Sequence, residues 1–222
     1  RLFFSGTIYD RVEFKAQYDF AGGDADVKDL WIALKQSWGK VQFGHFKEPF
    51  GLEELTSSKY LAFVERSLTS AFVPGRNSGV GFSGGDDKMN WGFGYFYDDD
   101  DYGVSTNEDI TNLTGRVVFR PVYEDGGKRL FHIGVAATQK ERGNADNFRF
   151  RVRPEAHFTG RLINTDRFLA DSALIYGIEL AGVNNQFWYA AEYITNDVDA
   201  PAFGDPSFDS YYVQAGYFLT EG

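Results

Sequence analysis

The sequence predicts an all-β fold, a transmembrane antiparallel β-barrel, from its composition, its period-two alternation and its rhythm of turns. Aromatic residues make up 18% of the 222 residues and glycine occurs 25 times, a combination typical of proteins built from many strands. No stretch approaches the roughly 18–20 consecutive apolar residues of a membrane helix. The mean hydropathy of −0.36 is compatible with a barrel, because lipid-facing and water-facing residues alternate and their hydropathies average out.

Apolar and polar residues alternate almost throughout the chain, most clearly in the run after Asp10. Successive side chains of a strand point to opposite faces, so this run has one apolar and one charged face. Such runs return at about the 9–11 residues that a tilted membrane strand needs, and we expect about twelve strands. The apolar face comprises Val12, Phe14, Ala16, Tyr18 and Phe20, and the polar face comprises Arg11, Glu13, Lys15, Gln17 and Asp19.

Short turns alternate with long polar connections, as in outer-membrane barrels, which have tight periplasmic turns and longer external loops. Clusters of Asn, Asp and Gly mark the turns. We expect tight turns at Tyr9–Asp10, Ser37–Gly39, Asp86–Lys88, Glu124–Gly127 and Asn184–Asn185, and long connections near residues 21–27, 48–77, 98–111, 140–147, 159–167 and 196–207.

Residues 1–222 are assigned to a single β-barrel domain. We expect it to be incomplete at both ends, because Arg1 opens directly on a strand-like run and Gly222 directly follows one. The connection 48–77 is unusual within this domain, since a loop of about thirty residues is normally functional or disordered. We expect it to fold into the lumen as a constriction loop with a short helix, the alternative being an external loop with one amphipathic turn. The helix is predicted from a 3.6-residue period in Leu52, Leu55, Leu61, Val64 and Leu68, with Thr56, Ser57 and Ser58 as possible caps.

The segment 148–154 (FRFRVRP) predicts a basic strand face. In a strand, Arg149, Arg151 and Arg153 share one face, while Phe148 and Phe150 share the other with Val152. Each arginine would cost roughly 2–4 kcal/mol at the bilayer midplane, so the arginines must face water, which in a barrel is the pore. Arginine suits oxyanions because its planar fork can hold two oxygens.

Further basic residues are candidates for the same lumen. Arg116 and Arg120 lie on the polar face of an adjacent predicted strand, and Lys15 lies on that of the early strand. The alternative reading is that inward arginines simply pair with inward acids, for which Glu155, Glu179 and Glu192 are candidates. The basic and acidic candidates in or beside the constriction loop are Lys47, Glu48, Lys59, Arg66 and Arg76.

Several segments resemble the phosphate-selective porin O/P family. Residues 46–60 (FKEPFGLEELTSSKY) are similar to the opening of that family's constriction loop, which is the most specific of the matches. Segments 63–68 and 74–77 resemble the continuation of the loop and its return into the next strand, and 149–155 resembles the family's arginine-rich strand. Weaker matches lie at residues 18–23, 115–116 and 216–221.

The resemblance implies a sixteen-stranded barrel that assembles as a homotrimer in the bacterial outer membrane, surrounded by lipid and lipopolysaccharide. It implies passive diffusion of small anions such as phosphate. The sequence departs from the family in its acidic loops, which would repel anions at long range, although salt screens this over about 8–10 Å. A general small-solute porin without phosphate preference, or a structural barrel associated with other proteins, therefore stays open. The acidic residues are Asp98–Asp101, Glu108, Asp109, Asp197 and Asp199.

Other classes of protein fit the sequence less well. The net charge of −10 argues against nucleic acid. The chain has no cysteine and only three histidines, none of which lies in a catalytic or metal-ligand motif, so we expect no enzyme, no metal and no cofactor. A soluble all-β binding module would place the Phe148/Phe150 face in a dry core and would purify without detergent.

Overall fold

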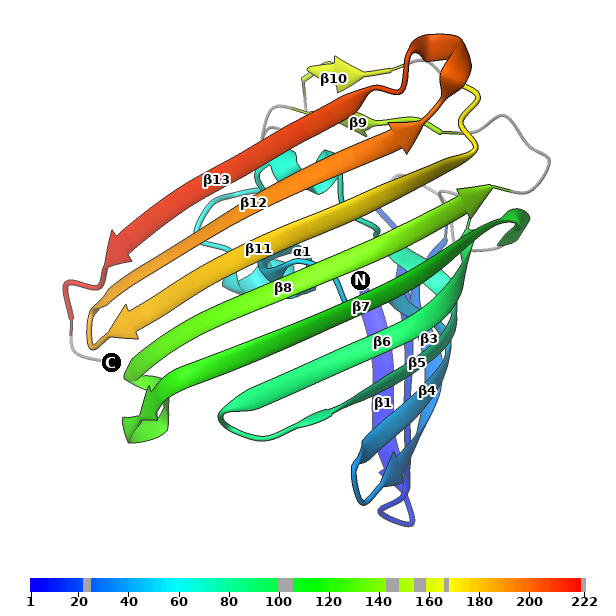
Figure 1. Cartoon of the computed structure of the whole chain (residues 1–222). Helices are drawn as coiled ribbons and strands as arrows, with labels where there is room; N and C mark the ends of the chain where they lie inside the picture. The colour runs from blue at the N-terminus through cyan, green and yellow to red at the C-terminus, as the bar shows by residue number, and fades with distance from the viewer. Residues whose placement is uncertain (22–24, 100–105, 143–147, 154–158, 166–167, 221–222) are drawn as a thin grey trace.

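The computed structural model describes residues 1–21, 25–99, 106–142, 148–153, 159–165 and 168–220. Eleven strands form one antiparallel sheet in which neighbours along the chain are neighbours in the sheet, in the order β1–β8 and then β11–β13. The sheet curls into a trough that is open along one side (Figure 1). Strands β9 and β10 form a separate two-stranded piece.

The strand bounds follow the predicted alternation. The strands are β1 (Leu2–Ile8), β2 (Val12–Asp19), β3 (Asp26–Gln36), β4 (Gly39–Lys47), β5 (Arg76–Gly85), β6 (Met89–Asp99), β7 (Thr106–Glu124), β8 (Arg129–Arg142), β9 (Arg151–Val152), β10 (Ile163–Asn164), β11 (Ser172–Asn184), β12 (Phe187–Asp199) and β13 (Ser207–Tyr217).

The predicted rhythm of turns is confirmed. Every connection at one end of the sheet has two to four residues, whereas the segment between β4 and β5 alone runs from residue 48 to residue 75. The tight turns use left-handed backbone at Tyr9 (φ 48°), Asp10 (φ 55°) and Asn185 (φ 54°). Such positive φ values match the right-handed twist of the flanking strands in two-residue hairpin loops.

Two expectations about the sheet need correction. The sheet has eleven strands rather than about twelve, and within the described residues it is not closed, since β1 and β13 each pair on one side only. The segment that contains Arg149, Arg151 and Arg153 accounts for the difference in number, because it was expected to be a wall strand and lies outside the large sheet.

The two faces of the sheet have opposite chemistry. On β11 the outward residues Leu174 and Ile178 are 41% and 53% exposed, whereas the inward residues Ile175 and Glu179 are buried. A soluble sheet hides its apolar face and exposes its charges; this sheet does the reverse, which suits contact with lipid outside and with polar groups inside. No described helix has the length and hydropathy to cross a bilayer.

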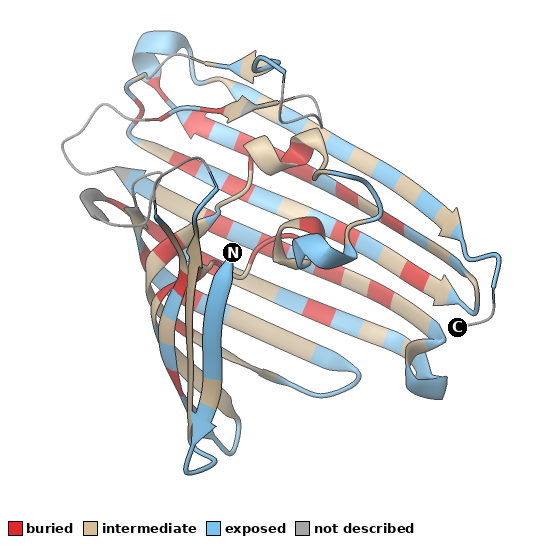
Figure 2. Ribbon diagram, turned by 180° about the vertical axis from the view of Figure 1, so that it is seen from behind, coloured by how far each residue is buried: buried red, intermediate tan, exposed pale blue. Residues whose placement is uncertain are grey.

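The long segment 48–75 lies against the concave face of the sheet (Figure 2). It contains three short helical turns, α1 (Leu52–Leu55), η1 (Ser58–Tyr60) and η2 (Leu68–Ala71). The short helix predicted from this apolar period is therefore not observed, apart from the single turn α1. The backbone becomes extended at Thr56, and Val64, assigned to the apolar face, is 94% exposed, so there is no buried face to hold one long helix.

Glycines in the strands make room for this segment. A Cβ on Gly92 of β6 would lie 3.1 Å from Cβ of Pro49, and one on Gly177 of β11 would lie 3.5 Å from Cζ of Phe50. The segment is thus seated directly on backbone at two places on the concave face.

The hydrophobic core lies on the concave side, between the segment and the second half of the sheet. Phe50 and Phe72 pack there against inward side chains of β8 and β11–β13. Phe148 and Phe150 complete the cluster, with the Phe150 ring 5.5 Å from that of Phe72. The aromatic face of the arginine segment therefore packs inside the trough rather than against lipid, which is why this segment is not a wall strand.

We predict that Gly92→Val loosens the segment 48–75, because the new side chain needs the space of Pro49. The measurement is the rate of protease cleavage within the segment in the folded protein, which should rise severalfold.

The matched control is Gly115→Val on the neighbouring strand β7, where the nearest atoms to a Cβ are 3.9 Å away. Equal cleavage of the two variants would contradict the seating described here.

Candidate functional site

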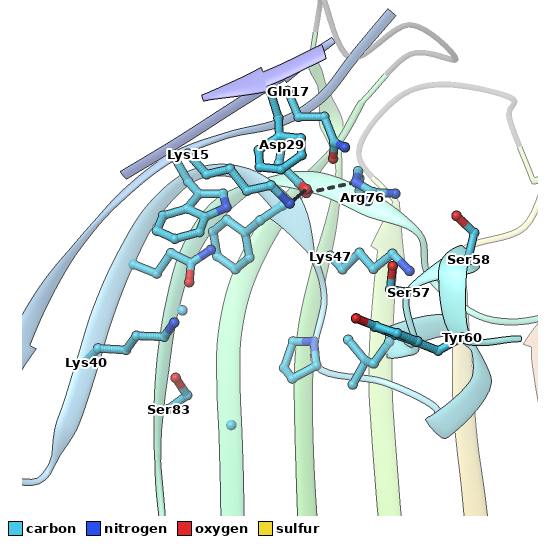
Figure 3. A pocket seen from close by; sticks show the side chains of 18 of the residues that line it. Lys15, Gln17, Asp29, Lys40, Lys47, Ser57, Ser58, Tyr60, Arg76 and Ser83 are labelled. Carbon is cyan, nitrogen blue, oxygen red and sulfur yellow. Dashed lines mark hydrogen bonds and ion pairs between the residues drawn. The ribbon is translucent and has the colours of Figure 1, made fainter. Parts of the chain in front are cut away.

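A cavity of about 860 Å³ lies between the first half of the sheet and the segment 48–75. Figure 3 shows Lys15 and Lys40 on the wall side and Ser57, Ser58 and Tyr60 on the side of the segment. Seven basic residues and one acid line this cavity, in a chain whose net charge is −10. The basic residues are Arg1, Lys15, Lys40, Lys47, Lys59, Arg66 and Arg76, and the acid is Asp29.

Asp29 on β3 is shared by two cations. Its Oδ2 lies 2.5 Å from Nζ of Lys15 on β2, and its Oδ1 accepts a hydrogen bond of 2.9 Å from Nε of Arg76 on β5. Asp29 is buried, and a buried carboxylate needs such partners. One carboxylate neutralises one of the two cations, so the group keeps a net positive charge and holds both basic side chains at the wall.

Glu54 at the end of α1 is shared in the same way. Its Oε1 lies 3.0 Å from Nζ of Lys47, and its Oε2 lies 3.4 Å from Nε of Arg66. Arg66 also donates to the carbonyl oxygens of Glu53 (3.0 Å) and Thr56 (2.7 Å). Arg66 therefore satisfies the carbonyl groups at the end of α1. Lys47 makes fewer hydrogen bonds and ion pairs with the protein than Arg66 does.

Lys40 and Lys59 are held less tightly. Nζ of Lys40 lies 3.7 Å from Oε2 of Glu13. The other oxygen of Glu13, Oε1, lies closer to Nζ of Lys35, at 3.1 Å. Lys59 in η1 is exposed, and none of the ion pairs found among the described residues involves its ammonium group. These two lysines therefore present charge to the cavity without being part of its framework.

Glu48 is an anchor of the segment rather than a wall residue of the cavity. It is fully buried, and its carboxylate accepts hydrogen bonds of 2.6 Å from both Asn77 and Asn112 and a further one from Thr114. Burial raises the pKa of the Glu48 carboxyl above its ordinary value, and these three hydrogen bonds oppose the rise. The network fixes the start of the segment to β5 and β7.

Glu192 on β12 holds the other side of the segment. Its carboxylate accepts hydrogen bonds from the backbone N–H groups of Leu52 (2.6 Å) and Glu53 (2.9 Å) at the start of α1. Asn196, four residues further along β12, donates to the carbonyl oxygen of Phe72 (3.1 Å). The sequence indicated Glu192 only as a partner for arginines, because nothing local links it to residues 140 positions away.

Arg116 and Arg120 face inward on β7 as predicted, but both make structural bonds. Arg116 pairs with Glu179 on β11, whose Oε1 is also 2.7 Å from Nε2 of His132. Arg120 donates to the carbonyl oxygens of Asp86 (2.6 Å) and Asp87 (2.7 Å) in the β5–β6 turn. Glu179 thus bonds to side chains of β7 and β8, and not to the arginines of the segment 149–153 as was expected.

The predicted arginine face lies apart from the cavity. Arg149 is exposed and donates to Oδ1 of Asn164 (3.0 Å), and Arg151 pairs along β10. Phe148 and Phe150 are buried on the opposite face, so the alternation of faces is confirmed although the location is not. Glu155 lies outside the described residues.

We predict that Glu48→Ala frees the segment, because three buried donors lose their acceptor. The expected loss is roughly 2–4 kcal/mol in the free energy of unfolding, measured from the denaturant dependence of the heat-modifiable folded band. Glu124→Ala, which removes an exposed pair with Arg129, is the control and should cost less than about 1 kcal/mol.

Glu48 also predicts a pH dependence. Because its pKa is raised in the folded protein, the stabilisation from the protonated carboxyl is complete below the ordinary carboxyl pKa and is lost as the pH rises through the raised value. Glu48→Gln imitates the protonated form and lacks this loss. Unfolding midpoints of the two proteins should diverge as the pH increases, and parallel profiles would contradict the assignment.

Comparison with known proteins agrees with the observed architecture. The family model for phosphate-selective porin O and P matches residues 1–222. An uncharacterised protein of Caulobacter vibrioides is 28% identical over 99% of this chain and 46% of its own length. Porin O of Pseudomonas aeruginosa is 24% identical over 81% of this chain and 46% of its own length. The chain thus spans about half the length of the curated relatives that it matches.

A solved structure has the same kind of fold. A loop-deletion variant of OmpT, an outer-membrane protein of Vibrio cholerae, superposes with a TM-score of 0.55 at 14% identity, over 98% of this chain and 67% of that one. A match over the entire chain, together with a segment seated on the concave face of an antiparallel sheet whose outward face is apolar, shows that the chain belongs to the phosphate-selective porin O and P family of the bacterial outer membrane.

Proposed function

We propose that the full protein forms a water-filled channel through which small anions diffuse passively across the outer membrane. The observation that carries this proposal is the excess of basic side chains around the cavity between the wall and the segment 48–75, where seven basic residues and one acid form the charged part of the lining. In this proposal the segment is the constriction loop, and the cavity is the narrow region in which ions are selected. Phosphate is one such anion, because lysine and arginine groups suit its oxygens.

The arrangement of the basic groups suits conduction. Asp29 and Glu54 each serve two cations, so each group has an excess positive charge that is fixed in place. A pore must attract its ion at several sites without holding it deeply at any one of them. Fixed ion pairs with an excess of one charge meet this condition better than isolated ammonium groups, because the carboxylate moderates the field of its partners.

Arg149, Arg151 and Arg153 are proposed as further anion-binding positions outside the narrow region. Their aromatic neighbours are buried in the core, so the segment is anchored with its basic face turned away from it. The acidic loops weaken the attraction of these arginines for anions. Asp98 forms an ion pair with Lys140 at 3.1 Å, whereas residues 100–101 lie outside the described part of the chain. Assembly as a homotrimer among lipopolysaccharide is part of the same proposal and derives from the family.

A weakly selective pore for small solutes is the second candidate. It is favoured by the structural bonds of Arg66, Arg116 and Arg120, which leave fewer guanidinium groups to bind ions. The two candidates differ in ion selectivity, which can be measured directly.

The test is the reversal potential of the full-length protein in a planar bilayer across a KCl gradient. We expect anion selectivity that falls at least twofold, as the Cl⁻/K⁺ permeability ratio, in Lys40→Gln/Lys59→Gln. These lysines are chosen because neither belongs to the buried pairs, so the fold should be retained.

The control is Lys128→Gln/Arg129→Gln, the same change of charge at the exposed β7–β8 turn, where salt screens charges over about 8–10 Å. The triple variant Arg149→Gln/Arg151→Gln/Arg153→Gln measures the contribution of the arginine face. A cation-selective wild-type channel would refute the anion proposal, and a correctly folded protein without conductance would refute the pore.

A further inference from the structure

The lining of the cavity is aromatic as well as basic. Six aromatic residues line it, beside the apolar Pro49 and Leu55. The inward face of a porin strand is ordinarily polar, so rings at these positions call for a separate explanation. The aromatic residues concerned are Phe3, Trp31, Phe46 and Tyr60, and Phe82 and Phe93 complete the aromatic lining.

Two of these rings carry an ammonium group beside them. Nζ of Lys40 lies 5.4 Å from the centre of the Trp31 ring, and Nζ of Lys15 lies 5.9 Å from that of Phe3. Both distances are within the range of cation–π contacts. Lys15 and Trp31 are also directly opposite each other on β2 and β3. Each pair therefore presents a positive charge and an aromatic surface within one side-chain length of each other.

A third ring faces the cavity from the segment 48–75. Tyr60 in η1 is 76% exposed, and Figure 3 shows it across the cavity from Lys15 and Lys40. A phenol ring in this position offers a stacking surface on the side opposite Trp31. Ser57 and Ser58 beside it add hydroxyl groups that can donate to oxygens.

The size of the cavity fits a body larger than an inorganic ion. About 860 Å³ is within the roughly 300–1,000 Å³ of sites that take whole organic molecules. An inorganic anion would contact only the ammonium and hydroxyl groups. An anion with an aromatic body would also contact the rings.

We infer that the cavity binds and passes organic anions with an aromatic body, such as aryl phosphates and arene carboxylates, with the anionic head at Lys15 and Lys40 and the ring beside Trp31 and Tyr60. This inference rests on the proposed function, because it assigns a class of substrate to the same cavity.

The test compares two blockers of the KCl current through the full-length protein, phenyl phosphate and methyl phosphate, which carry the same head group. We expect phenyl phosphate to reach half-inhibition at a concentration about tenfold lower, since ring stacking adds to the attraction of the charge. Trp31→Leu should bring the two concentrations to within about twofold of each other and leave the value for methyl phosphate unchanged. Lys40→Gln should weaken both.

Trp91→Leu, on the outward face of the sheet, is the matched control for the loss of an indole and should leave the preference intact. Equal inhibition by the two phosphates in an anion-selective channel would overturn this inference while the proposed function stands. A channel without anion selectivity would instead overturn the proposed function. If Trp31→Leu lowers the yield of folded protein, Tyr60→Leu at the exposed tip provides the same comparison, and an unchanged preference in it and in Trp31→Leu would overturn the placement of the ring.

Discussion

The carboxylate of Glu48 is the interaction on which the rest of the structure depends. It lies at the point where the chain leaves β4, it is fully buried, and its three side-chain donors come from β5 and β7. A buried carboxyl without such donors would be strongly destabilising. With them it fixes the direction in which the following residues leave the wall, and this direction brings Pro49 and Phe50 onto Gly92 and Gly177.

Three of the acids inside the trough are shared in the same way. Asp29, Glu54 and Glu179 each bind two basic groups, and in each case the three side chains come from different elements. Acids placed in this way link neighbouring strands and hold basic side chains in defined positions. The result is a cavity whose charged lining is mainly basic in a protein that is acidic as a whole. Net charge alone would have suggested a preference for cations.

Much of the fold could be predicted from the sequence, because strand alternation and turn chemistry are local. The faces of β2 and β7 and all five tight turns follow from neighbouring residues, and the structure confirms them. The location of the arginine segment could not be predicted, because Phe148 and Phe150 would suit lipid and an interior core equally well. The rings of Phe72, Phe168 and Phe208, which pack against them inside the trough, decide the matter. The clustering of Lys15 and Arg76 around Asp29 likewise depends on strand order, which periodicity does not give.

The seating of the segment 48–75 has a mechanical consequence. It is bonded to β5 and β7 through Glu48 and to β12 through Glu192 and Asn196. It therefore links β5 and β7 to β12 across the concave face of the sheet. In the proposed channel, the width of the passage would therefore be coupled to the curvature of the wall, and a change in either would have to break buried hydrogen bonds. Such a segment would give the passage a fixed bore.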